Sequence, residues 1–326
     1  MFFAGKAGRG GFREVVNVAM REPVMAVPDG KLDSEHAPRA ATPGDVWLRQ
    51  RRRVTIALFV APVAVMALLF VAPMLELVRL SLSGENGITL EGYAELLRPV
   101  YLRLMLFTFE LALEVTLLCL VIGYPLAFLL ANIQGAFVRW LTLALLISLW
   151  LSVLSRTYSW VILLQRNGVV NNFLVWSGIT DAPVGLVYNE VGVLIGMTHI
   201  LLPFMVLTLV PALRAIDPVL VRSAASLGAG PFMVFRRIYF PLSLPGVVAG
   251  SILVFTMALG FFITPAILGG GKTTTIVMAI RNQVQQLVDL RLASATSVVL
   301  LLVCFIILLL YERLSGVDRL FGAGKQ

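Results

Sequence analysis

The stretch Leu213–Gly246, LRAIDPVLVRSAASLGAGPFMVFRRIYFPLSLPG, is a polar island rich in proline and glycine, with strongly apolar sequence on both sides. Asp217 and Pro218 predict a helix start, because the carboxylate can accept from free backbone N–H groups and proline is tolerated at the first helical position. Gly228 and Gly230 permit the chain reversal that ends this short helix. The stretch therefore predicts an elbow between two apolar segments.

Two short helices are expected to form this elbow. The first carries a narrow apolar face of residues at helical spacing: Leu220, Ala224 and Leu227. The second starts at Pro231, and Pro241 and Pro245 are expected to end it. A helix–glycine–helix elbow of this kind between membrane spans suits recognition by another protein.

The elbow resembles the EAA loop of the permeases of ABC importers. In that family Glu-Ala-Ala precedes a glycine and, further on, an Ile-x-Leu-Pro pattern; here Gly228, Ile238 and Pro241 match the spacing. The acidic position holds Arg222 instead, which removes any ion pair that a glutamate would make. The resemblance implies docking into a cytoplasmic ATPase through Asp217, Arg222, Ser223, Ala224, Ala225, Leu227, Gly228, Ile238 and Pro241.

The composition is that of an integral membrane protein. Of 326 residues, 59% are hydrophobic and 13% charged, with a mean hydropathy of +0.90, whereas soluble domains are about 45–50% apolar and about 25% charged. The net charge of +8 does not indicate nucleic acid, since the basic residues are dispersed and lie mostly beside apolar spans. Cys119 and Cys304 lie within apolar runs and provide no disulfide framework or zinc spacing.

Six apolar segments of about 20 residues each predict an all-α membrane protein. They cover residues 54–78, 104–130, 140–163, 191–213, 245–268 and 292–312. Residues 1–53 are interpreted as a disordered cytoplasmic extension, 54–312 as the permease domain with a coupling loop at 214–244, and 313–326 as a cytoplasmic tail. The resemblance implies the type I ABC importer permease fold.

Basic residues predict the orientation of these spans. With the N-terminus inside, twelve Lys or Arg residues flank the spans on the inner side and eight on the outer side, and Arg51–Arg53 abut the first span. Positive charge favours the cytoplasmic side. We therefore expect both termini and the elbow in the cytoplasm of a bacterium, where an ATPase can reach the elbow.

Residues 56–312 look like the spermidine/putrescine-type permease subfamily. The matching stretches are Arg156–Trp160, Arg166–Gly168 with Asn171-Asn172, Tyr188–Glu190 and Thr264–Gly270. The resemblance implies an inner-membrane pore shared with a second permease, two cytoplasmic ATPase subunits, an external solute-binding protein and, most consistently, a polyamine as solute.

Catalytic and nucleotide-binding patterns are lacking. The run Gly269–Thr273 approaches a phosphate-binding loop, but that pattern needs glycine where the chain has Ala266. His36 lies in the extension, and His199 is isolated in the fourth span. We therefore expect no enzyme activity and no cofactor in this chain, with ATP and Mg²⁺ bound by the partner ATPases.

Glu110 and Glu114 are the most unusual intramembrane residues. They lie four apart and so share one helix face, and an acidic side chain near the bilayer centre is costly unless it faces protein or water. Two interpretations remain open: a wall of a cation pathway, or structural pairing to a neighbouring helix or subunit, for example through Arg156 or His199. Tyr158 and Trp160 complete the candidate pathway, although aromatic residues there also suit an interfacial belt.

Together these features predict a permease subunit of an ATP-driven, binding-protein-dependent importer. The alternative is a secondary transporter of a small organic cation driven by an ion gradient, in which broken helices and intramembrane acids also occur. The elbow discriminates between them, because a secondary transporter has no ATPase to contact.

Overall fold

The computed structural model describes residues 43–84 and 87–315. Most of the expected extension and the tail beyond residue 315 lie outside the described residues. Helix α1 (Pro43–Ser81) begins within the segment assigned to the extension, so residues 43–53 are helical. The chain divides into two units, residues 1–65 and 66–326, and the architecture below is that of the second.

Helices dominate the described chain, and a two-residue antiparallel hairpin is its only sheet. The hairpin strands are β1 (Ser83–Gly84) and β2 (Gly87–Ile88). The helices after α1 are α2 (Glu91–Leu96), α3 (Pro99–Asn132), α4 (Ala136–Trp150), α5 (Val153–Leu164), α6 (Val169–Trp176), α7 (Glu190–Arg214), α8 (Pro218–Ser226), α9 (Pro231–Val234), the π-helix η1 (Phe235–Tyr239), α10 (Phe240–Leu259), α11 (Ile263–Leu268), α12 (Ile276–Gln285) and α13 (Leu290–Ser315).

Five described helical segments are long and apolar enough to cross a membrane, and a bent pair of segments raises the number to six. The five cover Leu58–Ser81, Pro99–Asn132, Glu190–Arg214, Pro231–Leu259 and Leu290–Leu310. They agree with the predicted spans except at the third and fifth positions. The prediction of an all-helical membrane fold is therefore confirmed.

The third predicted span is not one straight helix. Helix α4 and the segment Val153–Trp176, which contains α5 and α6, are bent by 108° relative to each other, with Leu151 and Ser152 between them. The break contains neither proline nor glycine, so the sequence carries no local signal for it. Tertiary contacts hold α5 in its own direction, including a hydrogen bond of 3.1 Å between the buried hydroxyls of Thr157 and Thr264.

The fifth predicted span begins and ends earlier than expected. A continuous helical segment runs from Pro231 through η1 to Leu259, and α11 is a separate helix. Pro241 and Pro245 therefore do not end the second elbow helix. The π-turn accommodates the start of α10, because the Phe240 N–H bonds to the Phe235 carbonyl five residues earlier, and Pro241 lies in the first turn, where its missing N–H is tolerated.

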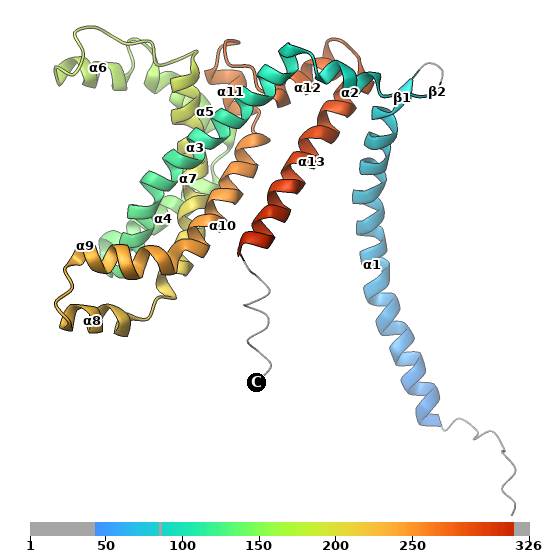
Figure 1. The fold of residues 1–326 in the computed structure, drawn as a ribbon, viewed down its shortest axis with the longest axis horizontal. Helices are drawn as coiled ribbons and strands as arrows, with labels where there is room; N and C mark the ends of the chain where they lie inside the picture. The colour runs from blue at the N-terminus through green and yellow to red at the C-terminus, as the bar shows by residue number, and fades with distance from the viewer. Residues whose placement is uncertain (1–42, 85–86, 316–326) are drawn as a thin grey trace, which may run out of the picture. The chain divides into compact units, whose positions relative to one another are not determined.

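The core is formed where α7 packs against α3 and α10 (Figure 1). Helix α7 presents a stripe of large apolar residues with a spacing of four, each at most 2% exposed: Met197, Leu201, Met205, Leu209 and Leu213. Glycines on the neighbouring helices admit this stripe closely, with Gly123 and Gly250 both facing Met205. Small residues at such crossings are typical of helix packing in membranes.

Candidate functional site: an exposed elbow and intramembrane acids

Hydrogen bonds between residues close in sequence cap both ends of α8, the first elbow helix. An Asp217 carboxylate oxygen accepts from the Val219 N–H at 2.8 Å. At the other end, Gly228 adopts φ +84°, and the N–H groups of Gly228 and Ala229 donate to the carbonyls of Ala225 and Ala224, each at 3.0 Å. This is a Schellman C-cap, which requires the left-handed conformation that glycine adopts readily. The predicted start and glycine reversal of α8 are confirmed.

Leu220 and Leu227, on the predicted apolar face of α8, are exposed. Leu220 and Leu227 are 48% and 88% exposed, because α8 lies at the end of the bundle and not within it. Val219, Phe232 and Met233 are also exposed. Several exposed large apolar side chains within one short segment indicate a site for another protein. We call these five residues, Val219, Leu220, Leu227, Phe232 and Met233, the elbow patch.

The remaining predicted elbow residues differ in their surroundings. Arg222, Ser223, Ala225 and Pro241 are exposed, Ala224 is half-buried, and Ile238 is half-buried against the core. Beneath α8 lies an apolar groove of about 340 Å³ that is lined by Phe128, Val221, Ala225, Ala229, Pro231, Val234, Phe235 and Tyr239. The groove leaves α8 lightly packed against the bundle, so α8 has room to shift.

The second elbow helix is attached to α3 by aromatic contacts that sequence reasoning missed. Phe235 packs edge-on against Tyr124 with ring centroids 5.7 Å apart, and Tyr239 packs against Phe128 at 4.9 Å. The Tyr239 hydroxyl also donates to the Asn132 side-chain oxygen at 2.9 Å. These contacts connect the second elbow helix to the second membrane span as well as to α10. The sequence signal that could have indicated them is the spacing of Phe232, Phe235 and Tyr239 after Pro231.

Glu110 and Glu114 lie on α3 in different environments. Glu110 is exposed, whereas Glu114 is half-buried and its Oε2 atom is enclosed without a hydrogen-bond partner. None of the ion pairs among the described residues involves either carboxyl group. Pairing with Arg156 or His199 within this chain is therefore absent from the described structure. An exposed acid on a spanning helix indicates that this face meets protein or water and not lipid.

A third carboxylate joins these two. Glu190, in the first turn of α7, lies near enough to Glu114 for their charges to repel each other. Its sequence position, at the predicted edge of the fourth span, gave no sign of this proximity. The packing of α3 against α7 brings the two acids together. Glu110 and Glu190 thus both lie near Glu114, and neighbouring carboxylates favour binding of a cation.

The remaining basic and aromatic candidate residues of the spans lie on α5 and α7. Arg156 is buried, and its Nη1 lies 3.4 Å from the Ser148 hydroxyl. Trp160 packs edge-on against His199 with centroids 5.5 Å apart. Tyr158 is 57% exposed and outside this contact. Trp160 therefore has a packing role in the structure, and Tyr158 is free to contact a solute or a partner.

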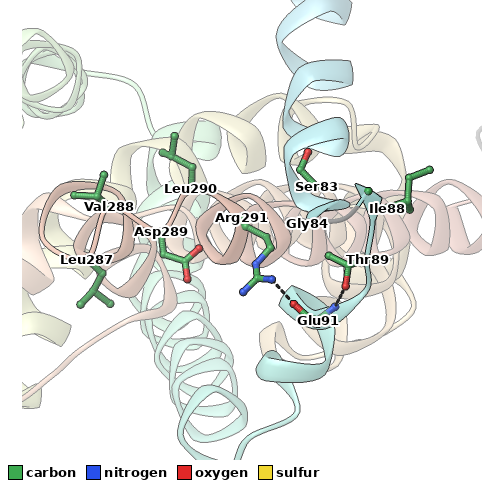
Figure 2. Close-up of a pocket in the computed structure, with 11 residues that line it drawn as sticks. Ser83, Gly84, Ile88, Thr89, Glu91, Leu287, Val288, Asp289, Leu290 and Arg291 are labelled. Atoms are coloured by element: carbon green, nitrogen blue, oxygen red, sulfur yellow. Dashed lines mark hydrogen bonds and ion pairs between the residues drawn. The ribbon is translucent and has the colours of Figure 1, made fainter.

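A polar groove of about 930 Å³ lies at the end of the bundle remote from the elbow. Helix α3, at ~1.5 Å per residue, separates the two ends by roughly 50 Å. Figure 2 shows the groove between the β1–β2 hairpin and the segment Leu287–Arg291. An ion pair between Arg291 and Glu91 spans it, and the Glu91 N–H donates to the Thr89 hydroxyl at 3.2 Å. The two walls are therefore held together.

The described residues contain no group of three or more His, Cys, Asp or Glu side chains with metal-ligand geometry. The Gly269–Thr273 run is a tight turn after α11, in which Gly270 and Gly271 take positive φ values of 56° and 79°. It precedes α12 and has Ala266 where a phosphate-binding loop requires glycine.

Apolar spans, an exposed elbow and acids on one spanning helix together define a pore-forming membrane transport subunit. Residues 41–316 match the family described as binding-protein-dependent transport system inner membrane component. The chain belongs to this family. Its members are transport subunits and not enzymes, as expected from the sequence, and the importer interpretation is favoured over the ion-gradient alternative.

Similar proteins of known name support the same assignment. The spermidine/putrescine transport system permease protein PotB of Salmonella typhimurium strain LT2 is 38% identical over 227 residues, covering 70% of this chain and 79% of that protein. PotB of Escherichia coli K12 is 37% identical over 227 residues, covering 70% of this chain and 82% of that protein. The suspected resemblance to this permease subfamily is therefore confirmed.

Solved structures confirm the fold. A chain from a bacterial ABC transporter involved in the import of the acidic polysaccharide alginate superposes with a TM-score of 0.68. It is 20% identical and covers 83% of this chain and 98% of its own length. The type I importer permease fold expected from the sequence is thus present.

Proposed function

We propose that this chain forms half of the translocation pore of an ATP-driven importer whose solute is a polyamine such as spermidine or putrescine. The observation that carries the choice of solute is the 37–38% identity to spermidine/putrescine permeases over 70% of the chain. Family membership supports the importer class independently of the solute.

The acids of the pore region suit this solute. Polyamines carry several ammonium groups along a flexible apolar chain. Glu110, Glu114 and Glu190 place carboxylates along α3 and at the start of α7, and Glu114 has an enclosed oxygen without a partner. An ammonium donates three hydrogen bonds and would satisfy that oxygen. We propose that these acids, together with Tyr158 and Trp160 of α5, bound the pathway of the cation.

The elbow is the proposed contact with the ATPase. Its support is the elbow patch, the light packing beneath α8 and the aromatic attachment to α3. Closure of two ATPase subunits on ATP would move α8, and the contacts of Phe235 and Tyr239 would pass that movement to α3 and α10. Arg222, where the family has an acid, is expected to meet an acidic residue of this chain's own ATPase.

Further partners follow from the same proposal. A second permease would cover the exposed face of α3, and an external solute-binding protein would dock at the end remote from the elbow, where the groove of Figure 2 lies. We place both termini and the elbow in the cytoplasm of a bacterial cell, from the distribution of basic residues. ATP and Mg²⁺ belong to the ATPases, and nucleic acid is not a partner.

Purification and reconstitution test the proposal. A tagged chain would be isolated from its native membrane with its associated subunits and placed in proteoliposomes with the co-purifying binding protein. Spermidine uptake should require ATP on the side of the ATPases and persist when ion gradients are collapsed. Uptake that needs an ion gradient and no ATP would refute the importer, whereas ATP-dependent uptake of a different solute would refute only the polyamine.

A further inference from the structure

A basic groove lies at the elbow end of the bundle, apart from both sites described above. It has a volume of about 650 Å³ and is lined by Ile133, Gln134, Gly135, Val138, Arg139, Thr142, Leu143 and Arg214. These residues come from the link between α3 and α4, the first turns of α4 and the last residue of α7. The neighbouring Asn132 bonds to Tyr239, which places the groove beside the elbow helices.

Two arginines give the groove its charge. Arg139 and Arg214 are both exposed, and neither takes part in an ion pair among the described residues. One N–H donor of Arg214 is already used, because its Nη2 donates to the Leu130 carbonyl at 3.1 Å. This hydrogen bond also holds the Arg214 side chain in place. The remaining donors of both guanidinium groups are available to an anion.

The start of α4 adds a second, independent attraction for an anion. Helix α4 has 15 residues and begins after Gly135, which provides no side-chain cap. The first N–H groups of a helix have no intrahelical partner, and the helix dipole favours negative charge there. Gly135 and Val138 both line the groove, so the start of α4 lies at its edge.

The residues around the groove indicate which kind of molecule supplies the anionic group. Ile133 and Leu143 line the groove and are 51% and 46% exposed, and Phe137 and Trp140 are exposed on another face of α4. Exposed aromatic and aliphatic residues beside a basic cluster at the end of a spanning helix are typical of the lipid headgroup region. A small soluble anion makes no favourable contact with these apolar residues, whereas the acyl chains of a lipid would bury them.

We propose that this groove binds an anionic phospholipid. Its phosphodiester would accept from Arg139, Arg214 and the first N–H groups of α4, and its acyl chains would lie along Ile133 and Leu143. The bound lipid would attach the start of α4 to the end of α7, immediately before the elbow. The inference concerns the lipid partner of this chain and is independent of which solute the pore carries.

Native mass spectrometry of the purified full chain with its associated subunits tests the proposal. Detergent-solubilised wild type should retain phosphatidylglycerol in preference to phosphatidylcholine. Arg139→Gln should weaken phosphatidylglycerol binding on the order of fivefold, and the Arg139→Gln/Arg214→Gln pair still more, because one basic residue near an anionic surface contributes about that factor. Arg139→Lys should retain most of the binding. Arg103→Gln, at the opposite end of α3, removes the same charge and should change nothing.

Three results would overturn the inference. Equal retention of the two lipids by the wild type would exclude a charge-selective site. Displacement of phosphatidylglycerol by inorganic phosphate or glycerol 3-phosphate at similar concentrations would assign the groove to a soluble anion. Wild-type retention by the Arg139→Gln variant, whose unchanged melting temperature would show that it is folded, would place the lipid elsewhere on the assembly.

Discussion

The proposed cation pathway depends on the carboxyl groups of Glu110 and Glu114. Replacing both by Gln keeps their size and removes their charge, so the uptake of spermidine by the reconstituted assembly should fall at least tenfold, the effect of losing about 1.4 kcal/mol of cation stabilisation. The affinity of the binding protein for spermidine should not change, because that step precedes the pore. Uptake rate and binding affinity measured on the same preparation separate the two steps.

Glu190 provides a matched test of the same pathway. It lies near Glu114 but belongs to a different helix. If the acids act together, Glu190→Gln should lower uptake in the same direction as Glu114→Gln. Normal transport by the Glu110→Gln/Glu114→Gln variant would contradict the pathway, and failure of that variant to assemble would support a structural role at the interface with the second permease.

Gly228 takes a left-handed conformation in open space. Its φ is +84°, and a Cβ at this position would meet no atom within 4 Å, so the cost of substitution within this chain is conformational alone. A non-glycine residue in this region costs about 1–2 kcal/mol, with Asn affected less and β-branched residues more. Gly228→Asn should therefore be milder than Gly228→Val in substrate-stimulated ATP hydrolysis, measured on the purified assembly in lipid.

Comparing Gly228→Asn with Gly228→Val also distinguishes a requirement for the turn conformation from a requirement for close contact with a partner. If a partner approaches Gly228 closely, both variants should uncouple hydrolysis from transport although each reaches the membrane at normal levels. Full transport by Gly228→Val would show that the elbow is not a coupling element and would remove the main local support for ATPase contact.

At the scale of the elements, the crossing of α7 and α10 depends on one missing methyl group. A side-chain carbon at Gly246 would overlap Ala212 of α7. Gly246→Ala should lower the stability of the solubilised protein by about 1–3 kcal/mol through overpacking, seen as a lower melting temperature. Gly185→Ala, where the space is open, should have little effect.

A second substitution, Ala212→Gly, tests whether the Gly246→Ala variant loses stability through contact with Ala212. Ala212→Gly removes the overlapping methyl group, so the Gly246→Ala/Ala212→Gly pair should recover part of the lost stability. Interacting residues show such non-additivity, whereas independent ones do not. Simple addition of the two single effects would mean that α7 and α10 do not meet at this point.

At the scale of the whole molecule, the proposed orientation, drawn from the distribution of basic residues, places the elbow inside the cell. In a background in which Cys119 and Cys304 are replaced, Ser226→Cys should resist a membrane-impermeant thiol reagent added to intact cells and react after permeabilisation. Leu287→Cys, in the remote groove, should react before permeabilisation because Leu287 is 66% exposed. The reverse labelling pattern would invert the topology and remove the proposed ATPase contact from the cytoplasm.

Local sequence determined the features that depend on neighbouring residues along the chain. The capping of α8 by Asp217 and the reversal at Gly228 follow from side-chain and backbone chemistry within a few residues. Most of the membrane spans follow from hydropathy, because an apolar segment of sufficient length must satisfy its backbone hydrogen bonds as a helix in lipid. The family patterns around the elbow likewise needed no structure.

Only the tertiary structure decided the features that depend on contacts between distant helices. The break between α4 and α5 has no proline or glycine and is held by contacts such as that of Thr157 with Thr264, 107 residues apart. The continuation of the second elbow helix into α10 depends on a π-turn that local propensity does not specify. Glu190 joins Glu114 because α3 packs against α7, and Leu227 stays exposed because α8 has no helix over it. In each case the packing between helices decides the outcome, and this packing depends on residues from segments that are far apart in the sequence.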